Sequence, residues 1–138
     1  MTEVTLSIIK PDAVSAGNAG HIVQSYLDAG FSVRGMKMIR MTTEQARAFY
    51  AVHKERPFYN DLVSFMTEGP VVVSILEAEN AVQKHREHIG STNPAEATDG
   101  TVRARFGTDI ERNAVHGSDS VENGVIETNF FFSQLERV

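Results

Sequence analysis

Val4-Thr5-Leu6-Ser7-Ile8-Ile9 is a short apolar run that ends at Lys10-Pro11-Asp12. A run of about four to eight such residues that stops at a turn signal predicts a buried β-strand. Pro70 to Leu76, which contains three consecutive valines, predicts a second, central strand. Between these two runs, Phe31 to Met41 predicts a further strand, in which Gly35 is a candidate β-bulge.

Helices are expected between and after these strands, in the segments 20–29, 42–53, 62–66 and 80–89. The second of these segments begins with a capping box, in which Thr42 caps the helix and Gln45 reaches back to it. Gly30 and Gly90 follow the first and last segments and are the expected C-terminal caps.

The C-terminal part of the chain is harder to assign. Ser91 to Asn113 shows no convincing periodicity, and a loop of that length in a small domain is usually functional or disordered. Because it keeps Phe106, Ile110 and several arginines, an ordered functional loop is expected. Glu127 to Phe132 is rich in aromatic residues and predicts the last strand.

The order of elements matches an α/β sandwich of the ferredoxin-like β-α-β-β-α-β plan, with one helix as an insertion. This plan implies an antiparallel sheet, helices on one face, and here a long loop before the last strand. No linker divides the chain, so residues 1–138 are expected to form a single domain.

Composition excludes several classes of protein. The formal net charge of -5 argues against non-specific binding of nucleic acid. No apolar run approaches the roughly 20 residues that cross a membrane, and the N-terminus lacks a secretory signal. There are no cysteines, so a thiolate nucleophile is excluded. A cytoplasmic protein without membrane or nucleic-acid partners is expected.

Basic residues gather between Lys84 and Arg112, and they form either an anion site or a solvated basic face.

The segment Asn113-Ala114-Val115-His116-Gly117-Ser118-Asp119-Ser120 holds the strongest chemical signal. Near pH 7 an imidazole is mostly neutral, so one ring nitrogen keeps a free lone pair. That nitrogen is a nucleophile if the other donates to a carboxylate or carbonyl. Gly117 would let the backbone approach a ligand closely. By itself, the same segment also fits a turn capped by Asx or Ser side chains, with an exposed histidine.

This segment resembles the signature of the nucleoside diphosphate kinases. Further motifs stand in the order and spacing of that family: Thr5 to Val14, Arg56 to Tyr59, Gly69 to Val72, Gly90 to Ala95, and Gly100 to Arg103. The resemblance runs from Val4 to Phe132. A P-loop pattern is absent from the sequence, so phosphate is not held in that way.

The resemblance implies that His116 attacks the terminal phosphate of a nucleoside triphosphate and carries it to a nucleoside diphosphate in a ping-pong mechanism. Glu127 would orient the ring through its second nitrogen, and Ser118 would support that carboxylate. Lys10 and Asn113 would reach the sugar hydroxyls and the phosphate nearest the nucleophile.

By the same analogy, Arg86, Thr92 and Arg103 would hold the outer phosphates, with Arg103 stabilising the group in transit. A guanidinium suits this role because it can donate two hydrogen bonds to one phosphate. The family also implies a Mg2+ ion that bridges the phosphates, with Asp119 near it through water. Such an ion leaves little protein signature.

The nucleotide base is expected between Phe58 and Leu62, where stacking tolerates any base. Tyr50 would support the pocket of the nucleophile, although its helical position also fits a core residue. The family forms homo-oligomers, so a tetramer or hexamer is expected.

Several assignments have structural alternatives. Arg86 could instead pair with Glu87 or Asp119. His85 and His88 lie three residues apart with no third ligand nearby, and are expected on a solvated helix face. Positions that depart from the family pattern are Arg105, Val125, Ile126 and Thr128. The departures around Glu127 make its alignment the least secure.

Two other functions remain open. A ferredoxin-like module could bind nucleotides without catalysis, since fold alone does not imply function. A histidine phosphocarrier in a signalling relay would pass the phosphate to proteins rather than to free diphosphates. The set of Lys10, Arg103, Asn113 and His116 favours the enzyme.

Overall fold

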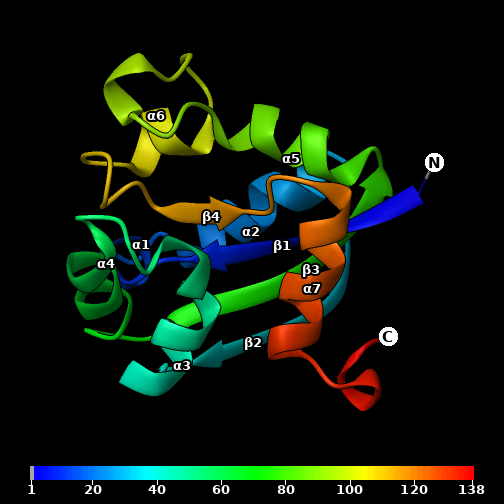
Figure 1. Cartoon of the computed structure of the whole chain (residues 1–138). Helices are drawn as coiled ribbons and strands as arrows, with labels where there is room; N and C mark the ends of the chain where they lie inside the picture. Colours follow the sequence, from blue (N-terminus) through cyan, green and yellow to red (C-terminus); the bar gives the residue numbers. More distant parts are fainter. Residues whose placement is uncertain (1) are drawn as a thin grey trace.

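The computed structural model of the chain describes residues 2–138. In this part of the chain one antiparallel sheet has the strand order β2-β3-β1-β4 (Figure 1). The strands are β1 (Thr2–Ile9), β2 (Ser32–Ile39), β3 (Val71–Glu79) and β4 (Val115–Gly117). β1 pairs with both β3 and β4, and Ile8 lies opposite Val73 on one side and His116 on the other.

The α-helices of the described chain are α1 (Pro11–Ser15), α2 (Ala19–Asp28), α3 (Thr43–Phe49), α4 (Tyr59–Met66), α5 (Ala81–Ile89), α6 (Val102–Phe106) and α7 (Val121–Phe131). Short 3-10 segments, η1 to η3, span Ala51–His53, Pro94–Glu96 and Gln134–Glu136. No helix of this part of the chain is long and apolar enough to cross a membrane.

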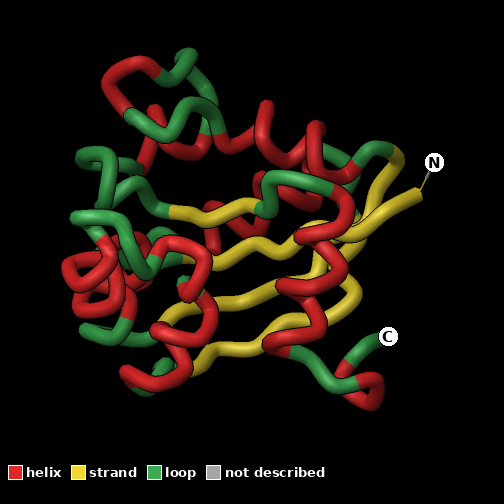
Figure 2. The backbone as a smooth tube through the Cα atoms, viewed as in Figure 1, coloured by secondary structure: helices red, strands yellow, loops and turns green. Residues whose placement is uncertain are grey.

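The expected ferredoxin-like plan with an antiparallel sheet is confirmed, but the expectation of helices on one face is wrong. Figure 2 shows helices in front of and behind the strands. Ile22 and Tyr26 of α2 pack with Ile89 of α5 on one face. α3, α4 and α7 cover the other face, where Ala46 and Phe65 belong to a second core. The reason is that β1 and β3 each bury consecutive residues, and therefore both of their sides, and such strands need cover on both faces.

Several local predictions are confirmed. Thr42 and Gln45 form the capping box of α3, with Gln45 N–H donating to Thr42 Oγ1 over 3.1 Å. The pairing of β2 with β3 shifts register between Val33 and Gly35, at the expected bulge. Gly30 follows α2 with a φ of +93°, a conformation that glycine adopts without strain.

The predicted last strand, Glu127 to Phe132, is wrong. These residues form the C-terminal part of α7 and its end, and the last strand is the short β4. Consecutive phenylalanines favour a strand locally, but Ser120 caps a helix by accepting the N–H of Asn123 over 3.0 Å. The loop expected from Ser91 to Asn113 is ordered and contains η2 and α6. The strand therefore carries His116, and the helix carries Glu127.

Candidate active site

A cavity of about 530 Å³ opens where β4, α4, α5 and α7 converge. Most of the predicted site residues line it: Lys10, Phe58, Leu62, Arg86, Thr92, Arg103, Asn113, His116, Asp119 and Glu127. The other two, Tyr50 and Ser118, are buried behind its wall. The fold thus brings together residues that are more than 100 positions apart in the sequence.

His116 is held in a chain of three side chains. Its Nε2 lies 2.8 Å from Glu127 Oε1, and Ser118 Oγ donates to the same oxygen over 2.7 Å. Ser118 in turn accepts the N–H of Leu6 over 3.0 Å, which ties the chain to β1. The ring of Phe49 packs against the imidazole in an edge-to-face arrangement, with ring centres 5.5 Å apart.

This geometry decides which ring nitrogen of His116 is free. Because a carboxylate accepts hydrogen bonds, Nε2 carries the proton that faces Glu127. Nδ1 therefore keeps its lone pair, and no described residue donates a hydrogen bond to it. The hydrogen bond to Glu127 thus leaves Nδ1 as the ring nitrogen with a free lone pair, which is what a histidine nucleophile needs.

Lys10 and Asn113 form a buried polar pair at the base of the cavity. Lys10 Nζ donates to Asn113 Oδ1 over 2.8 Å, and Asn113 Nδ2 donates to the carbonyl of Thr92 over 3.0 Å. Burial, together with the nearby charge of Arg103, lowers the pKa of Lys10 to about 8. The ammonium is thus poorly solvated, and an anion bound in the cavity would stabilise its charged form.

Arg103 is almost fully buried, at 8% exposed. Its Nη1 donates to the carbonyl of Gly90 over 3.0 Å and its Nη2 to that of Val115 over 2.8 Å. Burial and the charge of Arg86 lower the pKa of Arg103 to about 10. Because Arg103 binds the backbone next to His116, it fixes β4 and also presents positive charge there.

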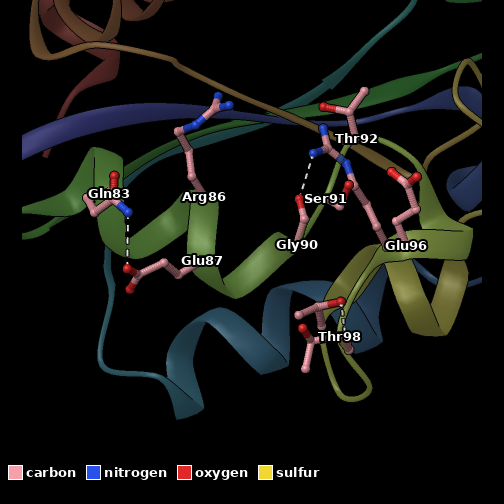
Figure 3. A pocket seen from close by; sticks show the side chains of 10 residues that line it. Gln83, Arg86, Glu87, Gly90, Ser91, Thr92, Glu96 and Thr98 are labelled. Atoms are coloured by element: carbon pink, nitrogen blue, oxygen red, sulfur yellow. Dashed lines mark hydrogen bonds between the residues drawn. The ribbon is translucent and has the colours of Figure 1, made fainter.

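Arg86 is exposed, and it makes no ion pair with any described residue. Figure 3 shows its side chain pointing away from Glu87, which accepts a hydrogen bond from Gln83 over 3.0 Å. The alternative pairing of Arg86 with Glu87 is therefore wrong. Arg86, Thr92 and Arg103 also line a polar hollow of about 690 Å³ on the outer side of α5 (Figure 3).

The mouth of the cavity is apolar. Phe58 is 46% exposed and Ile110 is 61% exposed, and both line the cavity with Leu62 and Val52. His53 lies beside Phe58, with ring centres 5.5 Å apart. Sequence reasoning did not select Val52, His53, Ile110, Glu111 or Asn123, which the structure adds to the lining. For these residues, the sequence offered only the expectation that the loop containing Ile110 and Glu111 is functional.

Two further predicted residues occupy different surroundings. Tyr50 is buried, and burial together with the charge of Glu127 raises the pKa of its hydroxyl. Its hydroxyl has no hydrogen-bond partner among the described residues, so Tyr50 supports the wall by packing. Asp119 is exposed at the cavity and accepts a hydrogen bond from Asn123 over 2.6 Å. The described residues contain no cluster of three or more potential metal ligands.

His85 does not lie on a solvated helix face, as the sequence had suggested. It is fully buried, with its ring edge-on to Tyr26 and Phe31 at 5.1 and 5.9 Å between ring centres. Burial lowers its pKa to about 3, so the ring is neutral. A Cβ at Gly117 would lie 2.6 Å from His85 Nδ1. Gly117 therefore lets β4 pack directly on α5. His88 is half-buried and lies 2.9 Å from Ser25 Oγ.

Fold and cavity together define an α+β domain that presents an imidazole among lysine and arginine side chains, an arrangement suited to the transfer of a phosphoryl group. The family model "Nucleoside diphosphate kinase" matches residues 3–137. A nucleoside diphosphate kinase of Chlamydia caviae is 55% identical over 136 residues, which cover 99% of this chain and 96% of that protein. One of Campylobacter concisus is 57% identical over 132 residues, or 96% of both chains.

Solved structures agree with these relatives. The nucleoside diphosphate kinase of Aquifex aeolicus superimposes with a TM-score of 0.99 at 47% identity, covering all of both chains. That of Halobacterium salinarum, solved in complex with CDP, gives 0.96 at 36% identity, covering all of this chain and 92% of the other. The chain belongs to the nucleoside diphosphate kinase family.

Proposed function

We propose that this chain transfers the terminal phosphate of a nucleoside triphosphate to a nucleoside diphosphate, with Nδ1 of His116 as the phosphate carrier. The observation that carries this proposal is the His116–Glu127–Ser118 chain, which leaves one nitrogen free inside a cavity lined by cationic side chains. The family assignment makes the chain a phosphotransferase that binds nucleotides.

In the first half-reaction, the Nδ1 lone pair attacks the terminal phosphorus. The bond from that phosphorus to the bridging oxygen breaks, and the nucleoside diphosphate leaves with the electron pair. In the second half-reaction, a terminal phosphate oxygen of another diphosphate attacks the phosphohistidine, and Nδ1 regains its lone pair. Glu127 stabilises the positive charge that develops on the ring by accepting the Nε2 proton in a hydrogen bond.

The phosphates would be held by side chains that differ in charge and reach. Arg86 and Thr92 lie at the exposed part of the lining and would bind the outer phosphates. Arg103 would stabilise the group in transit, because its positive charge lies next to β4. Lys10 and Asn113 would reach the sugar hydroxyls and the phosphate nearest the nucleophile.

The base would stack on Phe58 at the apolar mouth, against Leu62 and Ile110. Stacking uses the face of a base, which every base offers. Few polar groups in this part of the lining could read the edge of a base, so broad acceptance of nucleotides is expected. The substrates would thus be nucleoside triphosphates and diphosphates as a class.

Mg2+ fits the donor chemistry of the site. Asp119 offers an exposed carboxylate at the cavity, one oxygen of which is already held by Asn123. Magnesium is commonly bound by one or two carboxylates together with substrate phosphates and water. Asp119 would therefore hold the ion through water, and the bound ion would neutralise charge on the phosphates. The chain's own residues perform the positioning described above.

Three broader expectations accompany this function. We propose that residues 1–138 act as one domain, that the protein works in the cytoplasm, and that it assembles as a homo-oligomer, either a tetramer or a hexamer. Light scattering on the purified protein would measure the assembly directly. Neither a membrane nor a nucleic acid is an expected partner, given the formal charge of -5.

The test is incubation with ATP labelled at the γ-phosphate, followed by a chase with an unlabelled diphosphate. Acid-labile label on the protein and its transfer to the diphosphate are expected, and His116→Ala should lose both. His21→Ala is a matched control, because His21 is exposed on α2 outside the cavity.

Each contrary result points to a specific error. Label that remains in His116→Ala would mean that another residue is the nucleophile. Tight binding of nucleotide without label would favour the binding module. Transfer to proteins but not to free diphosphates would favour the phosphocarrier.

A further inference from the structure

The backbone just before the catalytic strand is strained. Ala114 has a φ of +74°, and the N–H of Val115 donates to the carbonyl of Asn113 over 2.9 Å. This combination is a γ-turn with a positive central φ, a conformation that residues with a Cβ adopt only at an energetic cost. Ala114 is fully buried, so solvent does not assist the turn. Something in the surrounding structure must therefore hold it.

The residues at the junction between β1 and α1 hold the turn in place through hydrogen bonds. The N–H of Ala114 donates to Asp12 Oδ2 over 3.1 Å, and its carbonyl accepts the N–H of Lys10 over 2.8 Å. Both backbone polar groups of the strained residue are thus bonded to this one junction. The second bond comes from the main chain, whereas the first depends on a single side chain.

Asp12 occupies a costly position. Its other oxygen, Oδ1, is buried and has no hydrogen-bond partner among the described residues. Burial raises the pKa of Asp12, which means that its charged form is poorly solvated. Several interactions offset this cost in part, and the first among them is the hydrogen bond from the backbone of Ala114, followed by the charge of Lys10. The bond to Ala114 is the one that reaches the strained turn.

The turn separates two functional side chains. Asn113, on one side of the turn, bonds to Lys10 Nζ inside the cavity. Val115, on the other side, begins β4, and His116 follows it opposite Ile8. If the turn relaxed toward an ordinary φ, the chain direction would change between Asn113 and His116. The distance between the phosphate-binding side chains and the nucleophile would change with it.

We propose that Asp12 is a positioning residue for phosphoryl transfer: its carboxylate holds the strained turn at Ala114 and so sets His116 relative to Lys10 and Asn113. This inference rests on the proposed function of the same site. Asp12 itself need not touch the nucleotide, because it acts through the backbone of Ala114.

The experiment measures the single-turnover rate of phosphohistidine formation at saturating ATP, together with the melting temperature, in Asp12→Ala, Asp12→Asn and their combinations with Ala114→Gly. Both Asp12 variants remove the negative charge, but only asparagine can still accept the N–H of residue 114. Asp12→Ala is therefore expected to be roughly ten- to a hundredfold slower than Asp12→Asn, as for a misplaced nucleophile.

Ala114→Gly supplies the second comparison. Glycine adopts a positive φ without strain, so the turn should persist without the hold of Asp12. The double variant Asp12→Ala/Ala114→Gly is expected to recover most of the rate lost in Asp12→Ala. Asp28→Ala is the matched control, because Asp28 is an exposed acid on α2 that bonds only Gln24 among the described residues. Its rate should equal that of the unmodified protein.

The outcomes separate this inference from the proposed function. If the unmodified protein takes up no label, the proposed function fails and the inference with it. If it is labelled but Asp12→Ala reacts as fast as Asp12→Asn, the role of Asp12 is overturned alone. If Asp12→Ala does not fold, the test uses Asp12→Asn and the double variant Asp12→Ala/Ala114→Gly instead. An Asp12→Asn rate within about threefold of the unmodified rate supports the inference. A double variant that folds but does not form phosphohistidine overturns it.

Discussion

Gly117→Ala tests whether the packing of β4 on α5 controls the rate of phosphoryl transfer. A Cβ at this position would lie 2.6 Å from His85 Nδ1 and 3.1 Å from Ile89 Cδ1. Ordinary van der Waals contacts begin at 3.4 Å. To widen the contact between the new Cβ and His85 Nδ1 from 2.6 Å to that distance, β4 would have to move away from α5 by about 0.8 Å. His85 is fully buried, which leaves its ring no room to move instead.

A displacement of that size next to His116 has a large kinetic effect. A misplacement of about 1 Å can lower a rate by about a hundredfold. Gly117→Ala is therefore expected to lower kcat by about thirty- to a hundredfold. The KM for the nucleotide should change less than kcat, because Phe58 and Arg86 lie outside β4. Quenched-flow measurement of phosphohistidine formation checks the rate, and thermal melting checks the fold.

A compensating substitution makes the test specific. His85→Ala removes the ring that the new methyl group meets, although the cavity should cost about 2 to 4 kcal/mol of unfolding free energy. The double variant Gly117→Ala/His85→Ala should then react faster than Gly117→Ala alone. Gly20→Ala is the matched control, because nothing lies within 4 Å of its new Cβ. A wild-type kcat in Gly117→Ala, or a double variant no faster than the single one, would refute the packing argument.

Three further predictions concern the charge of the site. Glu127→Gln keeps the shape but removes the carboxylate that selects Nδ1, so phosphohistidine formation should fall by about a hundredfold or more, and an unchanged rate would remove Glu127 from the mechanism. The pKa of His85 is lowered to about 3, below its unfolded value of 6.5, so the unfolded chain binds the extra proton and stability falls as pH drops below 6.5. The expected slope is about 1.4 kcal/mol per pH unit, and denaturant unfolding of His85→Leu between pH 6.5 and 4.5 should show that slope reduced. Asp119→Asn should raise the Mg2+ concentration needed for half-maximal activity and leave kcat at saturating Mg2+ nearly unchanged; an unaltered Mg2+ titration would contradict the role of Asp119.

Much of the site could be predicted because its residues lie in local motifs. Lys10 follows directly on the end of an apolar strand, and His116 lies among residues that turn sharply and donate hydrogen bonds. The chemistry of an imidazole is a property of the side chain itself, so it is visible before folding, whereas the role expected of Lys10 followed from the family resemblance. The structure brings both into one cavity, as expected.

Other residues could not be predicted from local patterns. His85 lies on a helix with charged neighbours, and only the approach of β4 and the rings of Tyr26 and Phe31 makes its position buried. The segment 127–132 favours a strand by composition, yet the Ser120 cap and the cover of the sheet make it a helix.

By itself, the sequence determined the order of most elements, the family motifs, and the identity of the imidazole and its cationic neighbours. Only the tertiary structure decided that helices cover both faces of the sheet, that β4 rather than 127–132 completes it, and that Asp12 bonds the strained turn at Ala114. The physical reason is that periodicity and caps act over a few residues, within reach of local inspection. Burial and hydrogen bonds between residues about 100 positions apart exist only once the chain has packed.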